Sequence, residues 1–278
     1  MFWFGSPKRI GKWPPEIAVS SWSLHPRISR GELKIVDFPR FAKKEFGKLG
    51  VSCLEVVVNH LLAEDERDME RLASEAKQAG MRTICLALSN DFTRASDLDR
   101  EVAETKRFMK VAKALGAPIV RVNPGMRGED PDEEQATNVA EGLRRLLRES
   151  KKLGVLLALE NHQLFGLNPA NTLRVLRILR WPRRVGVCLD FGNFYPENRD
   201  SGPRELAPHA IHAHAKAYSF DADGNEKTIK YLDRLRELKK AGFKGFISVE
   251  WEGKQGEDDI ENTRHAIRLI QRCLKKLS

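Results

Sequence analysis

Short apolar runs that suit buried strands alternate with longer segments of helical periodicity along the chain. The runs begin near residues 17, 51, 81, 117, 154, 184, 210 and 243, and successive starts lie 26–37 residues apart. Between them, segments such as 97–116 and 228–242 repeat apolar residues at helical spacing and end in Leu-Gly or Ala-Gly, which is typical of a helix C-terminus. This alternation predicts a parallel sheet covered by helices.

The number of strand–helix units selects the architecture. Eight units in 278 residues fit a single (β/α)8 TIM barrel, which typically needs about 250 residues, better than a doubly wound sheet. No linker-like or low-complexity stretch divides the chain. We therefore expect an α/β protein with one barrel domain over residues 17–278, preceded by an N-terminal tail or barrel cap over residues 1–16.

Composition is that of an ordinary globular protein. Hydrophobic residues make up 41% and charged residues 31% of the chain, and no apolar run approaches the roughly 18 residues that a membrane span needs. The aromatic and basic start lacks the apolar stretch of a secretory signal, so we expect a cytoplasmic protein. The four cysteines show no C-x-x-C spacing and are expected to be reduced, buried thiols.

Four consecutive apolar runs end in a chemically active side chain. The runs VLLALE, VGVCLD, IHAH and GFISVE end at Glu160, Asp190, His214 and Glu250, which the barrel assigns to strands five to eight. Catalytic groups of a (β/α)8 barrel gather at the C-terminal ends of its strands. The four side chains should therefore converge at one mouth of the barrel.

Three carboxylates and an imidazole in one partly dry site would repel one another and take up protons. A divalent cation removes this conflict, and three oxygen ligands with one nitrogen suit Mn²⁺, Mg²⁺, Co²⁺ or Zn²⁺. A single strand-end acid is more often a cap, and a single histidine more often a core residue, but four such residues on consecutive strands favour a metal site. We predict one divalent metal ion, with Mn²⁺ as the first expectation.

The motifs around these residues resemble those of a known superfamily. LALENH, VCLDFGN, HAHAK followed by FDADGNE, and ISVEWEG are similar to segments of xylose isomerase-like barrels, in particular the broad group of sugar-phosphate isomerases and epimerases. The resemblance extends over the chain after about residue 15 and is strongest in the C-terminal half. It implies that Glu160, Asp190, His214 and Glu250 are metal ligands in an isomerase or epimerase of a small sugar, polyol-derived ketone or sugar phosphate.

Isomerisation or epimerisation of a ketose removes a proton beside a carbonyl and returns it elsewhere. A metal can hold the carbonyl and hydroxyl oxygens and stabilise the enediolate, while a carboxylate on either face moves the proton. The resemblance implies this double role for Glu160 and Glu250 and leaves open which one is the base. Further residues near the ends of the predicted strands are expected to contact substrate, namely Glu55, Asn123, His162, Asn193 and Lys216.

Other functions use some of the same features. A dehydratase of inosose or dehydroshikimate type begins with the same proton abstraction. An endonuclease IV-like nuclease would suit the net charge of +9, but it needs three zinc ions and more histidines, and Asn193 stands where one is expected. A non-catalytic sugar-binding barrel would not require two opposed carboxylates at the metal. We therefore expect a small sugar or sugar phosphate as partner, no membrane and no nucleic acid, and the sequence leaves a homo-oligomer open.

Overall fold

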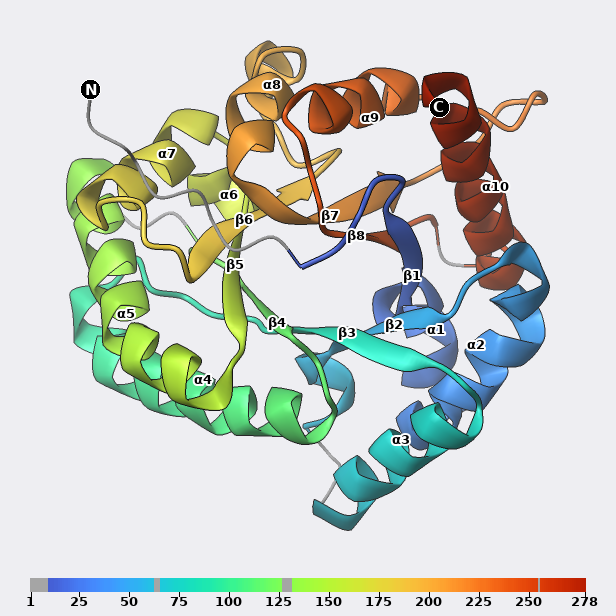
Figure 1. The fold of residues 1–278 in the computed structure, drawn as a ribbon, viewed down its shortest axis with the longest axis horizontal. Helices are drawn as coiled ribbons and strands as arrows, with labels where there is room; N and C mark the ends of the chain where they lie inside the picture. Colours follow the sequence, from blue (N-terminus) through green and yellow to red (C-terminus); the bar gives the residue numbers. More distant parts are fainter. Residues whose placement is uncertain (1–9, 63–65, 127–131, 255) are drawn as a thin grey trace.

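A closed barrel of parallel strands forms the centre of the molecule. The computed structural model describes residues 10–62, 66–126, 132–254 and 256–278, and within them the strands pair in chain order, with β8 closing on β1 (Figure 1). Each strand lies in one of the predicted apolar runs, which confirms the (β/α)8 barrel. The strands are β1 Glu16–Ser20, β2 Cys53–Val57, β3 Arg82–Ala87, β4 Ile119–Val122, β5 Leu156–Glu160, β6 Val185–Asp190, β7 Ala210–Ala217 and β8 Phe246–Trp251.

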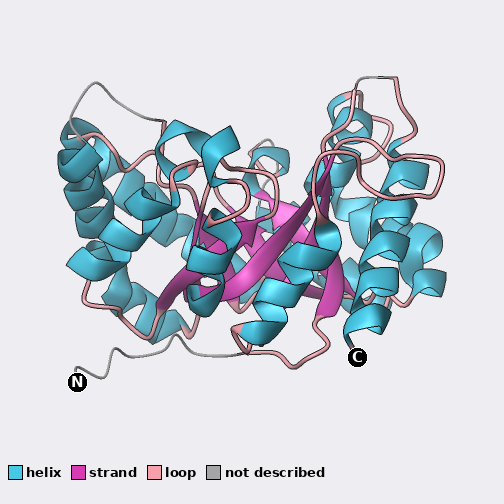
Figure 2. Ribbon diagram, turned by 90° about the horizontal axis from the view of Figure 1, so that it is seen from above, coloured by secondary structure: helices cyan, strands magenta, loops and turns pink. Residues whose placement is uncertain are grey.

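Helices form a ring around the strands, and Figure 2 shows the strands enclosed between them. The α-helices are α1 His25–Ser29, α2 Phe38–Phe46, α3 Glu66–Gln78, α4 Leu98–Ala114, α5 Asp132–Leu153, α6 Gln163–Gly166, α7 Pro169–Ile178, α8 Gly202–Leu206, α9 Tyr231–Lys240 and α10 Asp259–Leu277. The 3₁₀ helices are η1 Ser21–Leu24, η2 Ile35–Asp37, η3 Gly47–Leu49, η4 Val58–His60, η5 Ala95–Asp97, η6 Pro196–Asn198 and η7 Ala207–His209. Two helices end as predicted, because Gly116 and Gly242 have φ of 75° and 68°, which glycine adopts most readily.

Alternation of side chains along the strands builds two apolar layers. In β5, Leu157 and Leu159 belong to the layer beneath the helices, whereas Leu156 and Ala158 belong to the barrel interior. The interior layer consists of Ala18, Cys53, Ile84, Cys85, Ile119, Leu156, Ala158, Cys188, Ile211 and Phe246. All four cysteines are free and buried, as predicted. Nearer the C-terminal ends of the strands, the barrel interior contains buried polar and charged side chains.

Residues 10–15 lie at the end of the barrel where the strands begin. The N–H groups of Ile10 and Gly11 both donate to the carbonyl oxygen of Lys244, and Ile10 packs on the interior apolar layer. The first strand begins at Glu16, one residue before the predicted start of the barrel domain. Residues 1–9 of the predicted tail or cap lie outside the described residues. None of the described helices has both the length and the apolar character needed to cross a membrane.

The ends of the strands differ from prediction at β7 and, by one residue, at β8, which ends at Trp251 and not at Glu250. Glu160 and Asp190 are the last residues of β5 and β6, as predicted. The prediction that His214 ends its strand was wrong, because β7 continues to Ala217 and pairs with β8 up to that residue. The longer strand places Lys216 on the same inward face as His214.

Candidate active site

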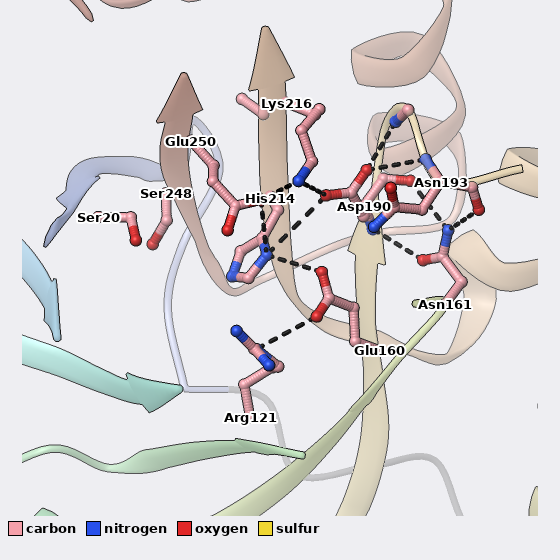
Figure 3. A network of polar contacts seen from close by, with 12 residues as sticks. Ser20, Arg121, Glu160, Asn161, Asp190, Asn193, His214, Lys216, Ser248 and Glu250 are labelled. Atoms are coloured by element: carbon pink, nitrogen blue, oxygen red, sulfur yellow. Dashed lines mark hydrogen bonds and ion pairs between the residues drawn. The ribbon is translucent and has the colours of Figure 1, made fainter. Parts of the chain in front are cut away.

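The four predicted ligands converge at the mouth of the barrel, as Figure 3 shows. One potential ligand atom from each of Glu160, Asp190, His214 and Glu250 lies within 4.8 Å of the others, and all four residues are buried. The Nδ1 atom of His214 faces the three carboxylates: it lies 2.9 Å from Glu160 Oε1, 3.6 Å from Glu250 Oε2 and 4.0 Å from Asp190 Oδ2. We call these four residues the mouth cluster.

The loop after β6 holds the Asp190 carboxylate in place. Its Oδ1 accepts hydrogen bonds from the backbone N–H groups of Gly192 at 2.7 Å and Asn193 at 2.9 Å. Asn161 secures the same loop, because its Oδ1 accepts from the Asp190 N–H and its Nδ2 donates to the carbonyl oxygens of Asp190 and Asn193. Asp190 Oδ2 accepts no hydrogen bond from the described residues. One carboxylate oxygen is therefore anchored, and the other remains available to the mouth cluster.

Two buried cations compensate part of the negative charge. Arg121 Nε lies 3.2 Å from Glu160 Oε2, and Lys216 Nζ lies 2.7 Å from Glu250 Oε2 and 3.7 Å from Asp190 Oδ2. Burial opposes ionisation of Glu160, but Arg121 and His214 together outweigh it and hold the pKa of this carboxyl well below its usual range. Burial raises the pKa of Asp190 to about 7 despite Lys216. The two cations thus neutralise part of the negative charge of the three carboxylates.

The residues of the mouth cluster fit a divalent cation. Glu160 Oε2 and Glu250 Oε2 each face one of the two cations, whereas Asp190 Oδ2 accepts no hydrogen bond from the described residues and has Lys216 Nζ only at 3.7 Å. Buried carboxylate oxygens of this kind are costly unless a cation or a donor satisfies them. A set of three carboxylates and one imidazole suits Mn²⁺, Mg²⁺, Co²⁺ or Zn²⁺. A bound ion would therefore satisfy Asp190 Oδ2 and relieve the repulsion among the three carboxylates.

A cavity of about 150 Å³ opens beside the mouth cluster. Of the predicted substrate contacts, Asn123, His162 and Lys216 line it. Glu250 also lines it, whereas Glu160 is fully buried and does not. The complete lining is Trp22, Val57, Asn59, Ser89, Arg121, Asn123, His162, Lys216, Glu250 and Glu252. A molecule in this cavity would thus meet a polar surface with one of the two acid–base candidates exposed to it.

One wall of the cavity is aromatic. Trp22 lies in η1, directly after β1, and its ring stacks on His25 with 4.3 Å between centroids. His25 in turn stacks on His60 at 5.3 Å, and the two rings share a contact of 3.0 Å between Nδ1 and Nε2. Of these three rings, Trp22 lines the cavity and gives it an apolar face.

Two predicted substrate contacts do not line the cavity. Asn193 contributes its backbone N–H to Asp190 instead. Glu55 was expected near the end of its strand, but it is the third residue of β2 and lies fully buried in the barrel interior. Its Oε2 lies 2.7 Å from His212 Nε2 and 3.0 Å from His214 Nε2. The side chain of Glu55 therefore contacts the mouth cluster from inside the barrel, through His214.

Sequence reasoning missed Arg121, Asn59 and Ser89. Arg121 carried a signal, because an arginine interrupts the apolar run APIVRV two residues before Asn123 and therefore shares its face. Its Nη1 donates to Asn123 Oδ1 at 2.6 Å and to the Leu88 carbonyl oxygen at 2.5 Å. Asn59 and Ser89, joined by a 2.7 Å hydrogen bond, follow β2 and β3 among other polar residues and carried no distinguishing pattern.

Two further groups of potential ligands lie deeper in the barrel. One contains Glu55, Cys85 and His212, and the other contains Cys188, His212 and His214. Burial raises the pKa of Cys188 to about 12 and that of Cys85 well above its usual value, and protonated thiols are poor ligands. Among the described residues, the mouth cluster is the group that lies beside the cavity.

Known proteins share this architecture. The sequence matches the family described as xylose isomerase-like TIM barrel over residues 44–273. The structure is similar to that of the IolI protein with a bound zinc atom, with a TM-score of 0.74 and 18% identity over 94% of this chain and 98% of the other. It is also similar to 3-keto-D-glucoside 4-epimerase, YcjR, from E. coli, with a TM-score of 0.71 and 14% identity over 93% of this chain and 100% of the other.

A shorter match links the chain to a curated relative. The 3'-dehydrocarminate deglycosidase alpha subunit of a Microbacterium species is 34% identical over 90 residues. The match covers 31% of this chain and 25% of that relative, so the chain matches only about a quarter of the relative's length.

Proposed function

Because the chain belongs to the xylose isomerase-like TIM barrel family, we propose that its mouth cluster is the metal site of an isomerase or epimerase. The proposed substrate is a small sugar, polyol-derived ketone or sugar phosphate. The observation that supports this most is the convergence of three carboxylates and one imidazole nitrogen within 4.8 Å, beside a cavity of about 150 Å³. One neighbour of similar fold is a 3-keto-D-glucoside 4-epimerase.

The reaction we propose begins with removal of a proton from the carbon beside a carbonyl group. When bound, the metal ion would supply Lewis-acid stabilisation of the negative charge that develops on the substrate oxygen. Glu250 is our first candidate for the group that takes the proton, because it lines the cavity. Lys216, at 2.7 Å from Glu250 Oε2, would hold that carboxylate in position. Glu160, held by Arg121, is the second acid–base candidate.

The remaining cavity residues would hold and orient the substrate. Asn123 and His162 present polar atoms to the cavity, and Trp22 presents its ring. Burial lowers the pKa of His162, so its imidazole is neutral near pH 7 and can both donate and accept a hydrogen bond. Such a lining suits a polyhydroxylated molecule, whose hydroxyl groups need both donors and acceptors.

Elimination from a keto sugar is a second candidate reaction. It begins with the same proton abstraction beside a carbonyl but ends with loss of a neighbouring group instead of reprotonation. The match to the 3'-dehydrocarminate deglycosidase alpha subunit favours this candidate. A dehydratase acting on an inosose would follow the same course. The products distinguish the two reactions, because only elimination releases the neighbouring group.

Proton exchange tests both candidates. The Mn²⁺-loaded protein is incubated in D₂O with ketoses, ketose phosphates, inososes and 3-keto-glucosides, quenched with EDTA and analysed by NMR. We expect deuterium to enter the carbon beside the carbonyl, and the product to distinguish epimerisation, isomerisation and elimination. If the protein binds one metal ion yet exchanges no proton of any compound in this panel, the result would argue against a catalytic site.

A matched pair of variants links exchange to the site. Glu250→Gln should abolish exchange. Glu101→Gln should leave exchange unchanged: Glu101 is also a buried acid, 5% exposed, but it lies on the outer helix α4 and not on a barrel strand. Equal exchange in both variants would remove Glu250 from the proposed mechanism.

A further inference from the structure

Glu55 occupies an unusual position for a carboxylate. It is fully buried in the barrel interior, on β2, beneath the mouth cluster. One oxygen, Oε2, receives three contacts from β7 and β8: His212 Nε2 at 2.7 Å, His214 Nε2 at 3.0 Å and Ser248 Oγ at 3.0 Å. Among the described residues, its ion-pair partners are these two histidines. The three strands therefore meet at a single carboxylate oxygen.

Burial of this carboxylate is not explained by stability. Removing a carboxylate from water is costly, and an apolar residue of similar volume commonly stabilises a buried site equally well or better. The interior layer directly beneath consists of apolar and thiol side chains, and such residues would fill the position of Glu55 without that cost. A negative charge at this point therefore calls for a function that an uncharged side chain would not supply.

The two ring nitrogens of His214 have different surroundings. Nδ1 faces the mouth cluster, with Glu160 Oε1 at 2.9 Å, whereas Nε2 faces Glu55 Oε2 at 3.0 Å. An ionised carboxylate only accepts hydrogen bonds, and a neutral imidazole carries one N–H. Either nitrogen could donate to the carboxylate that it faces, but a cation held by the mouth cluster needs the lone pair of Nδ1. The single proton of a neutral His214 ring then lies on Nε2, where Glu55 accepts it.

We propose that Glu55 is a positioning residue that holds His214 in the Nε2–H tautomer, with Nδ1 presented to a divalent cation. The inference rests on the proposed metal site. Glu55 acts only through His214, since it does not line the cavity where a substrate would lie. His212 and Ser248 support the arrangement, because each places a donor within 3.0 Å of the same Glu55 oxygen.

Metal affinity provides the first test. In Glu55→Gln, a neutral amide replaces the carboxylate at nearly the same volume, so His214 loses its charged acceptor. We expect Mn²⁺ affinity, measured by titration calorimetry on the full chain, to fall by about 10–100-fold, as is typical when the partner of a metal-bound histidine is removed. Glu101→Gln serves as the matched control, because it removes another buried carboxylate from α4, and its Mn²⁺ affinity should equal that of the wild type.

The tautomer itself provides the second test, and it does not depend on the variant folding. In the Zn²⁺-loaded wild type with ¹⁵N-labelled histidine, we expect NMR spectra to show the proton of His214 on Nε2 and the metal on Nδ1. A proton on Nδ1, or an unchanged Mn²⁺ affinity in a folded Glu55→Gln protein, would overturn the role of Glu55.

Failure of the proposed function gives a different result. If the wild type and a His214→Ala variant bind Mn²⁺ equally, the mouth cluster is not the metal site, and the role of Glu55 falls with it. If His214→Ala weakens binding but Glu55→Gln does not, the metal site stands and only the inference about Glu55 is wrong.

Discussion

Lys216 and Glu250 lie directly opposite each other on β7 and β8, and the Lys216 ammonium is 2.7 Å from Glu250 Oε2. The same ammonium is 2.7 Å from Glu252 Oε2 and 3.7 Å from Asp190 Oδ2. Burial would lower the pKa of Lys216, but Glu250 and the other acids hold it well above its usual value. Lys216 is therefore a fixed positive charge among three acids, next to a site that we propose binds a second cation.

Lys216→Met should destabilise the metal-free protein more than the metal-loaded one. Removing one partner of a buried ion pair typically costs about 3–5 kcal/mol, because the remaining charge is left uncompensated. A divalent cation bound to Asp190 and Glu250 would supply part of the missing positive charge. Urea unfolding of the variant with EDTA and with Mn²⁺ measures both values, and Lys230→Met, which breaks the exposed pair with Asp200, should change neither. An equal loss in both conditions would mean that the metal does not neutralise these acids.

Glu250→Gln and Glu160→Gln should both lose activity but for different reasons. Glu250 lines the cavity, so its loss removes the proposed proton acceptor, an effect typically of about 10²–10⁴-fold on the rate. Glu160 is fully buried beside Arg121, so Glu160→Gln should act mainly by weakening metal binding. Rate constants at saturating Mn²⁺ separate the two: Glu160→Gln should recover part of its activity and Glu250→Gln should not. Full recovery of Glu250→Gln would assign the acid–base role elsewhere.

Removal of the metal should lower the stability of the folded chain. A ligand that binds only the native state at about 100 times its Kd stabilises it by about 2.7 kcal/mol. We expect EDTA to lower the melting temperature and Mn²⁺ to restore it, with no such response in Asp190→Asn. That variant removes one carboxylate of the mouth cluster and leaves the side-chain volume nearly unchanged. A thermal shift of equal size in Asp190→Asn would place the responding metal outside the mouth cluster.

Much of the fold and the centre of the candidate site could be predicted from the sequence. Strands in a parallel barrel are buried on both faces, so each appears as a continuous apolar run. A charged residue that ends such a run, as Glu160 and Asp190 do, stands out against it. The topology then brings the ends of consecutive strands together, which is why four residues far apart in sequence could be grouped without a structure.

The depth of a side chain in the barrel could not be predicted. It depends on how the strands are tilted and staggered against one another, and that stagger is a property of strand pairs. The register between β2 and β3 shifts at Leu54 and Glu55, and β7 extends beyond His214 through its pairing with β8. Neither the register shift nor the extension of β7 can be read from a single sequence. Glu55 was therefore expected at the cavity, and the position of Lys216 within its strand was missed.

The histidine pair behind Trp22 should make stability depend on pH. His60 is 9% exposed, its Nδ1 lies 2.9 Å from Ser21 Oγ, and its Nε2 faces His25 Nδ1 at 3.0 Å. Burial, with a smaller contribution from His25, lowers the pKa of His60 to about 4. The unfolded chain has the ordinary histidine pKa of about 6.5, so between these values it binds a proton that the folded chain does not.

The stability that neutral His60 provides is therefore complete above about pH 6.5 and is lost progressively as the pH falls towards 4, by at most about 3 kcal/mol. Urea unfolding in EDTA at pH 7 and pH 4.5 should show a smaller pH-dependent loss in His60→Gln than in the wild type. His265→Gln, which replaces a histidine of the outer helix α10 whose side chain is 40% exposed, should match the wild type. If His60→Gln loses as much stability as the wild type on acidification, another group is responsible, and the other histidines whose pKa burial lowers, such as His25 and His162, would be examined next.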